Sequence, residues 1–210
     1  GTVGHGTVTA MVAPVDGRRR MLGPLGGEPL QGHVVCFPHA GGTASGYHWW
    51  VDQSPERQVW GVTLPGRGRL SAEPVARDWP SLVARLVSEV ARLRGPVVLL
   101  GYSLGALLAY EVARDLTARG APPAHLVVVA RGAPETGPVV SWPDDDGRLL
   151  ELVAERYGGV PDAVRDDHEL LRATVPILRA DLELVRTYAW LTGPPLTCPD
   201  RKSTRLNSSH

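Results

Sequence analysis

A chain of 210 residues, 43% of them hydrophobic, is long enough to bury one sizeable core, so a single domain is expected. Its 22 lysines and arginines balance 22 aspartates and glutamates, which argues against nucleic acid and anionic membrane surfaces as partners. No apolar run approaches the roughly 18 residues of a membrane span, and the first residues lack a signal-peptide pattern. We therefore expect a cytoplasmic protein whose partners are small molecules or other proteins.

The first 29 residues are rich in glycine, proline and arginine and show no sustained hydrophobic period, which favours a flexible leader. From residue 30 onward, short apolar runs alternate with helical patterns. Four runs, each β-branched or Leu-rich and bounded by Gly or Pro, predict buried strands of a parallel sheet: 33–37, 59–64, 96–102 and 125–130. Cys36, inside the first run, and Cys198 show no metal-ligand spacing and are expected to be reduced thiols.

Between the later runs, apolar residues recur at helical spacing. Residues 79–94 place an apolar stripe on one helical face at Leu82, Leu86, Val90 and Leu93. The residues after Ser103 repeat this spacing until Gly120. Strands and helices in this order predict an α/β sandwich of the doubly wound kind.

From about residue 144 the pattern changes to helices without intervening strands, with an interruption expected at Pro176. This predicts a helical insertion over about 144–190, above one end of the sheet. Insertions at the carboxyl ends of strands commonly act as lids.

The stretch Gly101-Tyr102-Ser103-Leu104-Gly105 fits the G-x-S-x-G nucleophile elbow and falls where an apolar run ends and a helical pattern begins. In such a turn the serine has a strained backbone, and glycines two residues away relieve crowding against neighbouring segments. The free N–H groups of the following helix can stabilise an oxyanion. Ser103 is therefore the candidate nucleophile, with Gly101 and Gly105 as structural parts of the motif.

A second stretch, Pro38-His39-Ala40-Gly41-Gly42, follows the first strong strand, where hydrolases with this elbow place the other oxyanion donor. We predict that the backbone N–H groups of Ala40 and Leu104 form the oxyanion hole. His39 precedes the serine, whereas these enzymes order their triad Ser, acid, His, so a role in shaping the loop is expected for it.

Five separated motifs together resemble the type II thioesterases of polyketide and nonribosomal peptide synthesis: CFPHAGG, LPGRG, GYSLGALLAYEVARDL, PILRADLELVRTY and PPLTCP. Tyr102 and Leu104 stand where that family often has His and Met. The resemblance covers about residues 33–199. It implies an α/β-hydrolase fold with a helical lid, a Ser-Asp-His triad, and hydrolysis of acyl groups from the phosphopantetheine arm of an acyl or peptidyl carrier protein. It implies no metal and no organic cofactor.

The acid and base of that triad are not evident in the sequence. His125 begins a predicted strand and should lie at the end of the sheet opposite Ser103, and His168 lies among acids in the lid segment. Residues 200–210 are polar and lack any strand period, so a non-native tail is expected there, with the thioesterase domain at 30–199 and its last strands missing. Asp200 and His210 would then be coincidental.

Two alternatives to the thioesterase remain open. An esterase or lipase would share the elbow but would not be expected to carry the PILRADLELVRTY and PPLTCP motifs. A non-catalytic carrier-binding protein would keep the fold without hydrolysis, because the triad Asp and His are absent.

Overall fold

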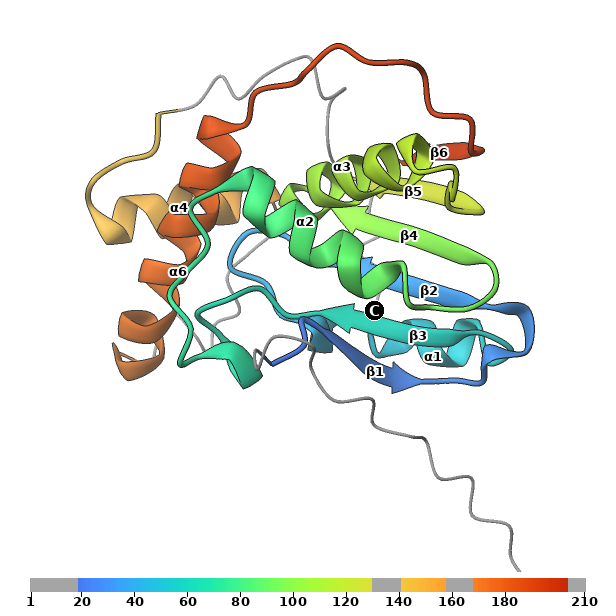
Figure 1. Ribbon diagram of the computed structural model, residues 1–210. Coiled ribbons are helices and arrows are strands. Elements are labelled where there is room, and N and C mark those ends of the chain that lie inside the picture. The colour runs from blue at the N-terminus through green and yellow to red at the C-terminus, as the bar shows by residue number, and fades with distance from the viewer. Residues whose placement is uncertain (1–18, 130–140, 158–167, 204–210) are drawn as a thin grey trace, which may run out of the picture.

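The computed structural model describes residues 19–129, 141–157 and 168–203. They form a six-stranded sheet with the strand order β1-β3-β2-β4-β5-β6 (Figure 1). The strands are β1 (Leu22–Gly26), β2 (His33–Phe37), β3 (Gln58–Val62), β4 (Val97–Tyr102), β5 (His125–Val129) and β6 (Asp200–Ser203). β1 is antiparallel to β3, and every other neighbouring pair is parallel. The predicted, mostly parallel α/β architecture is confirmed, and the four predicted strands correspond to β2, β3, β4 and β5.

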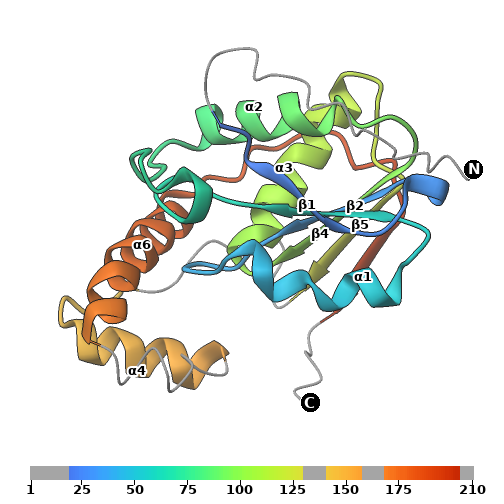
Figure 2. The same ribbon diagram turned by 90° about the horizontal axis from the view of Figure 1, so that it is seen from below.

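Helices cover both faces of this sheet. α2 (Trp79–Val90) and α3 (Leu104–Ala118) pack on one face, and the short α1 (Trp49–Gln53) lies on the other (Figure 2). Within β2, Val35 and Phe37 join the core shared with α2 and α3, whereas Val34 and Cys36 join the cluster on the α1 side. Because both faces are covered, all five residues of β2 are buried, and the four after His33 are apolar.

Two further helices, α4 (Asp146–Tyr157) and α6 (His168–Thr187), lie beyond the carboxyl ends of the parallel strands (Figure 1 and Figure 2). We call this pair the lid. Its buried apolar contacts are Leu149, Leu150, Val175, Leu178 and Leu182. Ala40, in the loop after β2, packs against the same cluster, so the lid touches the loop that holds a predicted oxyanion donor. Within the described ranges no helix is long and apolar enough to cross a membrane.

The interruption expected at Pro176 was wrong, because α6 continues through this residue. An interior proline removes one helical hydrogen bond and crowds the preceding turn, at a cost of about 3 kcal/mol. Buried residues before and after Pro176 lie on the same face of the helix: Val175, Leu178, Leu182 and Val185. Burial of this face offsets the cost of the proline, whose own ring is exposed.

The expectation of a flexible leader over residues 1–29 was wrong for residues 22–26, which form β1. Met21 is fully buried, and the Glu89 carboxylate on α2 accepts the N–H groups of Met21 at 2.8 Å and Leu22 at 2.9 Å. Glu89 is distant in sequence, so the local composition of the segment contains no sign of this anchor. Residues 1–18 lie outside the described residues.

Replacing Glu89 with glutamine is expected to lower the melting temperature by roughly 4–8 °C. The amide group cannot accept from both backbone N–H groups, and a buried donor that loses a charged partner costs about 2 kcal/mol of unfolding free energy. Thermal unfolding followed by circular dichroism measures the change, with Ser88→Ala, at an exposed position of the same helix, as the control. Equal melting temperatures for the two variants would show that Glu89 does not anchor β1.

The polar stretch 200–210 was expected to contain no strand, and this was wrong for Asp200–Ser203. These residues form β6, which pairs in parallel with β5 from Leu126 with Asp200 to Val129 with Ser203. Strand pairing is made by backbone hydrogen bonds, so a segment without apolar alternation can still join a sheet edge. Residues 204–210 lie outside the described residues.

Candidate active site

Ser103 lies at the turn from β4 into α3. Its φ of 53° and ψ of −111° make it the one non-glycine residue with positive φ in the described part of the chain. Its N–H donates to the carbonyl of Val129 at the end of β5, at 3.0 Å. The chain therefore contains the strained strand-to-helix turn that the motif requires.

Glycine is needed on both sides of Ser103 because neighbouring backbone comes very close. A Cβ on Gly101 would lie 2.2 Å from the carbonyl oxygen of Gly105, and a Cβ on Gly105 would lie 2.0 Å from that of Phe37. Both distances are far below a van der Waals contact of roughly 3.5 Å. Since the obstacles are backbone atoms, no side-chain rotation can remove them, and the end of β2 is fixed against the first turn of α3.

The loop 38–42 is held between this elbow and the lid. A Cβ on Gly105 would also lie 2.7 Å from the Pro38 carbonyl oxygen, and a Cβ on Gly41 would lie 3.2 Å from Cδ1 of Leu178 in α6. Gly41 has a φ of 72°, a left-handed conformation that glycine adopts without steric cost. Gly41 therefore allows both the turn of the loop and the close approach of α6.

Both predicted oxyanion donors belong to these two touching segments. Leu104 is the first residue of α3, where N–H groups have no intrahelical acceptor and lie at the positive end of the helix dipole. The N–H of Ala40 in loop 38–42 has no acceptor among the residues that the structure describes. The loop and the helix thus each bring an unbonded N–H to the neighbourhood of the elbow.

His39 contacts both the loop and the residue before the nucleophile. Its Nδ1 lies 2.9 Å from the carbonyl oxygen of Ala40, and with that nitrogen protonated the ring donates to the carbonyl. The ring also meets Tyr102 edge-on, with centroids 5.7 Å apart. Both contacts lie at the loop and the elbow, and the role of His39 in shaping the loop stays a prediction.

Within the described ranges no imidazole forms a hydrogen bond with the Ser103 hydroxyl. His125 opens β5 and pairs with Val98, five residues before Ser103, which is roughly 16 Å at about 3.3 Å per residue. It therefore lies at the opposite end of the sheet, as expected. The side chains of His168 and Asp200 and the whole of His210 lie outside the described residues.

A buried ion pair, not identified from the sequence, joins the lid to loop 38–42. Arg67 donates to both carboxylate oxygens of Asp181, from Nη1 to Oδ2 at 2.7 Å and from Nη2 to Oδ1 at 2.6 Å. Oδ2 of Asp181 also accepts the N–H of Gly41 at 2.7 Å, and Nη1 of Arg67 donates to the carbonyl of Gly42 at 3.1 Å. Arg67 is 4% exposed and Asp181 2%, so this network is closed to solvent.

The sequence does contain one sign of this pair. Asp181 lies between Leu178 and Leu182 on the apolar face of α6, where a charged residue needs a buried partner. Arg67 belongs to the LPGRG motif and Asp181 to PILRADLELVRTY. In the sequence these two motifs only support the family resemblance, whereas in the structure they contact each other through this ion pair.

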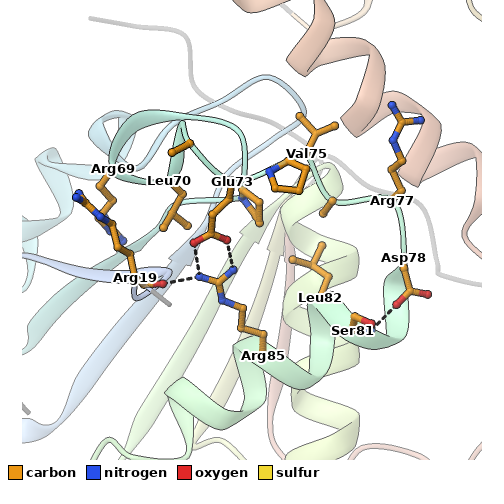
Figure 3. A pocket seen from close by; sticks show the side chains of 14 residues that line it. Arg19, Arg69, Leu70, Glu73, Val75, Arg77, Asp78, Ser81, Leu82 and Arg85 are labelled. Carbon is orange, nitrogen blue, oxygen red and sulfur yellow. Dashed lines mark hydrogen bonds and ion pairs between the residues drawn. The ribbon is translucent and has the colours of Figure 1, made fainter. Parts of the chain in front are cut away.

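A cavity of about 510 Å³ lies between residues 65–78 and the start of α2 (Figure 3). Arg85 binds both carboxylate oxygens of Glu73 there, at 2.5 and 3.1 Å. Asp78 caps α2 by accepting the N–H of Ser81 at 2.8 Å, and this hydrogen bonding lowers the pKa of Asp78. Neither Ser103 nor loop 38–42 lines the cavity, so it is separate from the elbow.

Cys36 does not provide a second nucleophile. Its thiol is fully buried in β2, and burial raises its pKa to about 12. The reactive thiolate is therefore scarce at neutral pH. Cys36 and Cys198 form no disulfide, in agreement with the prediction of reduced thiols.

Comparison with known sequences shows the family. The model of the thioesterase domain family matches residues 32–208 of this chain. The chain is 36% identical over 172 residues to thioesterase PikA5 of Streptomyces venezuelae, covering 79% of this chain and 60% of that protein. It is 37% identical over 166 residues to a probable cadicidin biosynthesis thioesterase of Streptomyces griseus, covering 77% of this chain and 45% of that protein. The chain thus spans about half of the length of these curated relatives.

Solved structures show the same relationship. RedJ, a thioesterase from the prodiginine biosynthetic pathway in Streptomyces coelicolor, has a TM-score of 0.75 and 38% identity, covering 83% of this chain and 70% of that chain. BorB, the type II thioesterase from the borrelidin biosynthetic cluster, has a TM-score of 0.75 and 31% identity, covering 87% of this chain and 77% of that chain. These neighbours have the α/β-hydrolase fold that the resemblance implies. The chain belongs to the thioesterase domain family of the α/β-hydrolase fold.

Proposed function

We propose that Ser103 is the nucleophile of a thioesterase that hydrolyses acyl groups from the phosphopantetheine arm of a carrier protein in polyketide or nonribosomal peptide synthesis. The observation that carries this proposal is the left-handed backbone of Ser103 at the start of α3, beside loop 38–42. A solved neighbour with 31% identity, YbtT, is named a type II thioesterase from the yersiniabactin NRPS/PKS biosynthetic pathway, which supports the choice of substrate.

The proposed reaction has two steps. The Ser103 Oγ attacks the thioester carbonyl while a base accepts its proton, and the N–H groups of Ala40 and Leu104 stabilise the tetrahedral oxyanion. Each such donor contributes about 2.7–4 kcal/mol to transition-state stabilisation. The C–S bond then breaks and the thiolate leaves with little assistance. Water attacks the acyl-serine ester in the second step, which releases the acid and restores Ser103. No metal or organic cofactor enters these steps.

The base is the part of this proposal that the described residues do not supply. A neutral imidazole suits the task because its pKa lies near neutral pH. We propose that the base and the acid that orients it are among the side chains that the structure does not describe.

One comparison tests the substrate class. A carrier protein bearing an acyl-phosphopantetheine and a p-nitrophenyl ester of the same acyl group are each incubated with the chain, and free acid is measured by mass spectrometry. The carrier-bound thioester should turn over at least about tenfold more efficiently, because contacts to the carrier and its arm add binding energy at the transition state. Preference for the ester would instead support an esterase.

The second candidate is a carrier-binding protein without hydrolysis, favoured by the missing imidazole at Ser103 among the described residues. The same assay, run beside a measurement of acyl-carrier binding, separates the two functions. Binding of the acyl-carrier with no Ser103-dependent release of acid would support this second candidate.

A further inference from the structure

The peptide unit between Ala40 and Gly41 is held at both of its polar ends. Its carbonyl oxygen lies 2.9 Å from Nδ1 of His39, and its N–H donates to Oδ2 of Asp181 at 2.7 Å. Because a peptide unit is planar, two bonds on opposite sides fix its orientation. The Ala40 N–H belongs to the preceding peptide unit, His39–Ala40, which meets this held unit at the Ala40 Cα. Its direction therefore follows from two side chains, one of them on the lid, through the backbone torsion at Ala40.

Arg67 in turn fixes the carboxylate that makes this contact. Its two terminal nitrogens bind the two oxygens of Asp181, a bidentate geometry that leaves the carboxylate little freedom to rotate. Nη1 of Arg67 also donates to the carbonyl of Gly42. One buried network thus joins the loop after β2, the loop after β3 and helix α6.

Stability alone is a weak explanation for this network. Burying two charges has a large desolvation cost, and well-packed hydrophobic residues in place of a buried ion pair are often as stable. In addition, Nε of Arg67 is buried without a hydrogen-bond partner in the described part of the chain, so the pair is not fully satisfied. Its position against loop 38–42 gives the pair a second role.

We infer that Arg67 and Asp181 are positioning residues, which hold the Ala40 N–H in the oxyanion site and make this donor depend on the docking of α6. This inference rests on the proposed function. When α6 is docked, Asp181 reaches Gly41 and the loop has the conformation described. When α6 moves away, the carboxylate leaves with it, and the loop loses one of the two bonds that orient the Ala40–Gly41 peptide. Acylation is thereby confined to the state in which the lid covers the loop.

The experiment compares Ser103 acylation with carrier binding in the double variant Arg67→Met/Asp181→Leu. Acylation is measured by the release of p-nitrophenol from p-nitrophenyl butyrate in single-turnover conditions. Carrier affinity is measured with an acyl-carrier, with Ser103→Ala added to both chains to prevent turnover. Acylation should fall about 100-fold or more, as for loss of one oxyanion donor, while the Kd stays unchanged because the pair is buried. If the pair had a merely structural role, the acylation rate and the carrier affinity would fall together.

Glu183→Gln is the matched control, because Glu183 forms an exposed ion pair with Arg186 on the same helix and does not touch loop 38–42. Its acylation rate should equal that of the wild type. A folded double variant with the wild-type acylation rate would overturn the inference alone. A wild-type chain that is not acylated would overturn the proposed function, and the inference with it.

Asp181→Asn decides the question if circular dichroism shows that the double variant does not fold. Its amide oxygen can still accept the Gly41 N–H, but it cannot bind Arg67 through two oxygens. Acylation should then fall by an intermediate factor, roughly tenfold. A rate equal to that of Glu183→Gln would contradict the positioning role.

Discussion

Replacing Ser103 with alanine is expected to lower acyl release at least about a thousandfold and to abolish covalent labelling by a fluorophosphonate. In the proposed reaction this hydroxyl forms the acyl-serine ester, and the buried Cys36, with its raised pKa, is not expected to replace it. Intact-mass spectrometry after incubation with the reagent measures the labelling. The wild type should gain one adduct on Ser103, whereas a labelled Ser103→Ala chain would contradict this assignment of the nucleophile.

Ser103→Gly is the matched variant for the backbone of the elbow. A φ of 53° costs a non-glycine residue about 1–3 kcal/mol, and this cost remains in Ser103→Ala but is relieved by glycine. Both variants should be inactive, yet Ser103→Gly should melt roughly 2–4 °C above Ser103→Ala, which corresponds to about 1 kcal/mol after the entropy cost of glycine. Equal melting temperatures would show that the turn is not strained.

The central strands could be predicted from the sequence because each is covered on both faces. Burial on two sides requires an uninterrupted apolar run, which is visible without knowledge of the neighbours, as in β2 and β4. The edge strands β1 and β6 do not need an uninterrupted apolar run. β1 depends on Glu89 and on the backbone of β3, and β6 depends on the backbone of β5, so neither carries a local pattern that reveals it.

The same contrast applies to the site. The elbow around Ser103 and the loop 38–42 could be predicted because each is encoded in a few consecutive residues with fixed backbone demands. The Arg67–Asp181 pair joins residues 114 apart, and Asp181 reaches Gly41 across 140 residues, so no local spacing encodes these contacts. The acid on the apolar face of α6 was visible, but its partner could be identified only from the fold.

Replacing Gly105 with alanine is expected to destabilise the chain by about 3 kcal/mol or more. The added Cβ would lie 2.0 Å from the carbonyl oxygen and 2.5 Å from the carbonyl carbon of Phe37, so backbone must move. Phe37 is not free to do so, because it pairs with Gly101 in β4 and its carbonyl accepts the Tyr47 hydroxyl at 2.8 Å. Either the end of β2 separates from β4 or the first turn of α3 shifts.

Thermal unfolding measures this effect, and a loss of about 3 kcal/mol corresponds to a melting temperature lower by roughly 6–12 °C. Gly46→Ala is the control, because a Cβ there would meet nothing within 4 Å. Covalent labelling of Ser103 should also slow in Gly105→Ala, since any shift of Phe37 displaces the loop that carries Ala40. If both glycine variants melt at the same temperature, β2 and α3 do not approach as closely as described. Loop 38–42 would then owe its position to its contacts with Arg67 and with Asp181 on the lid.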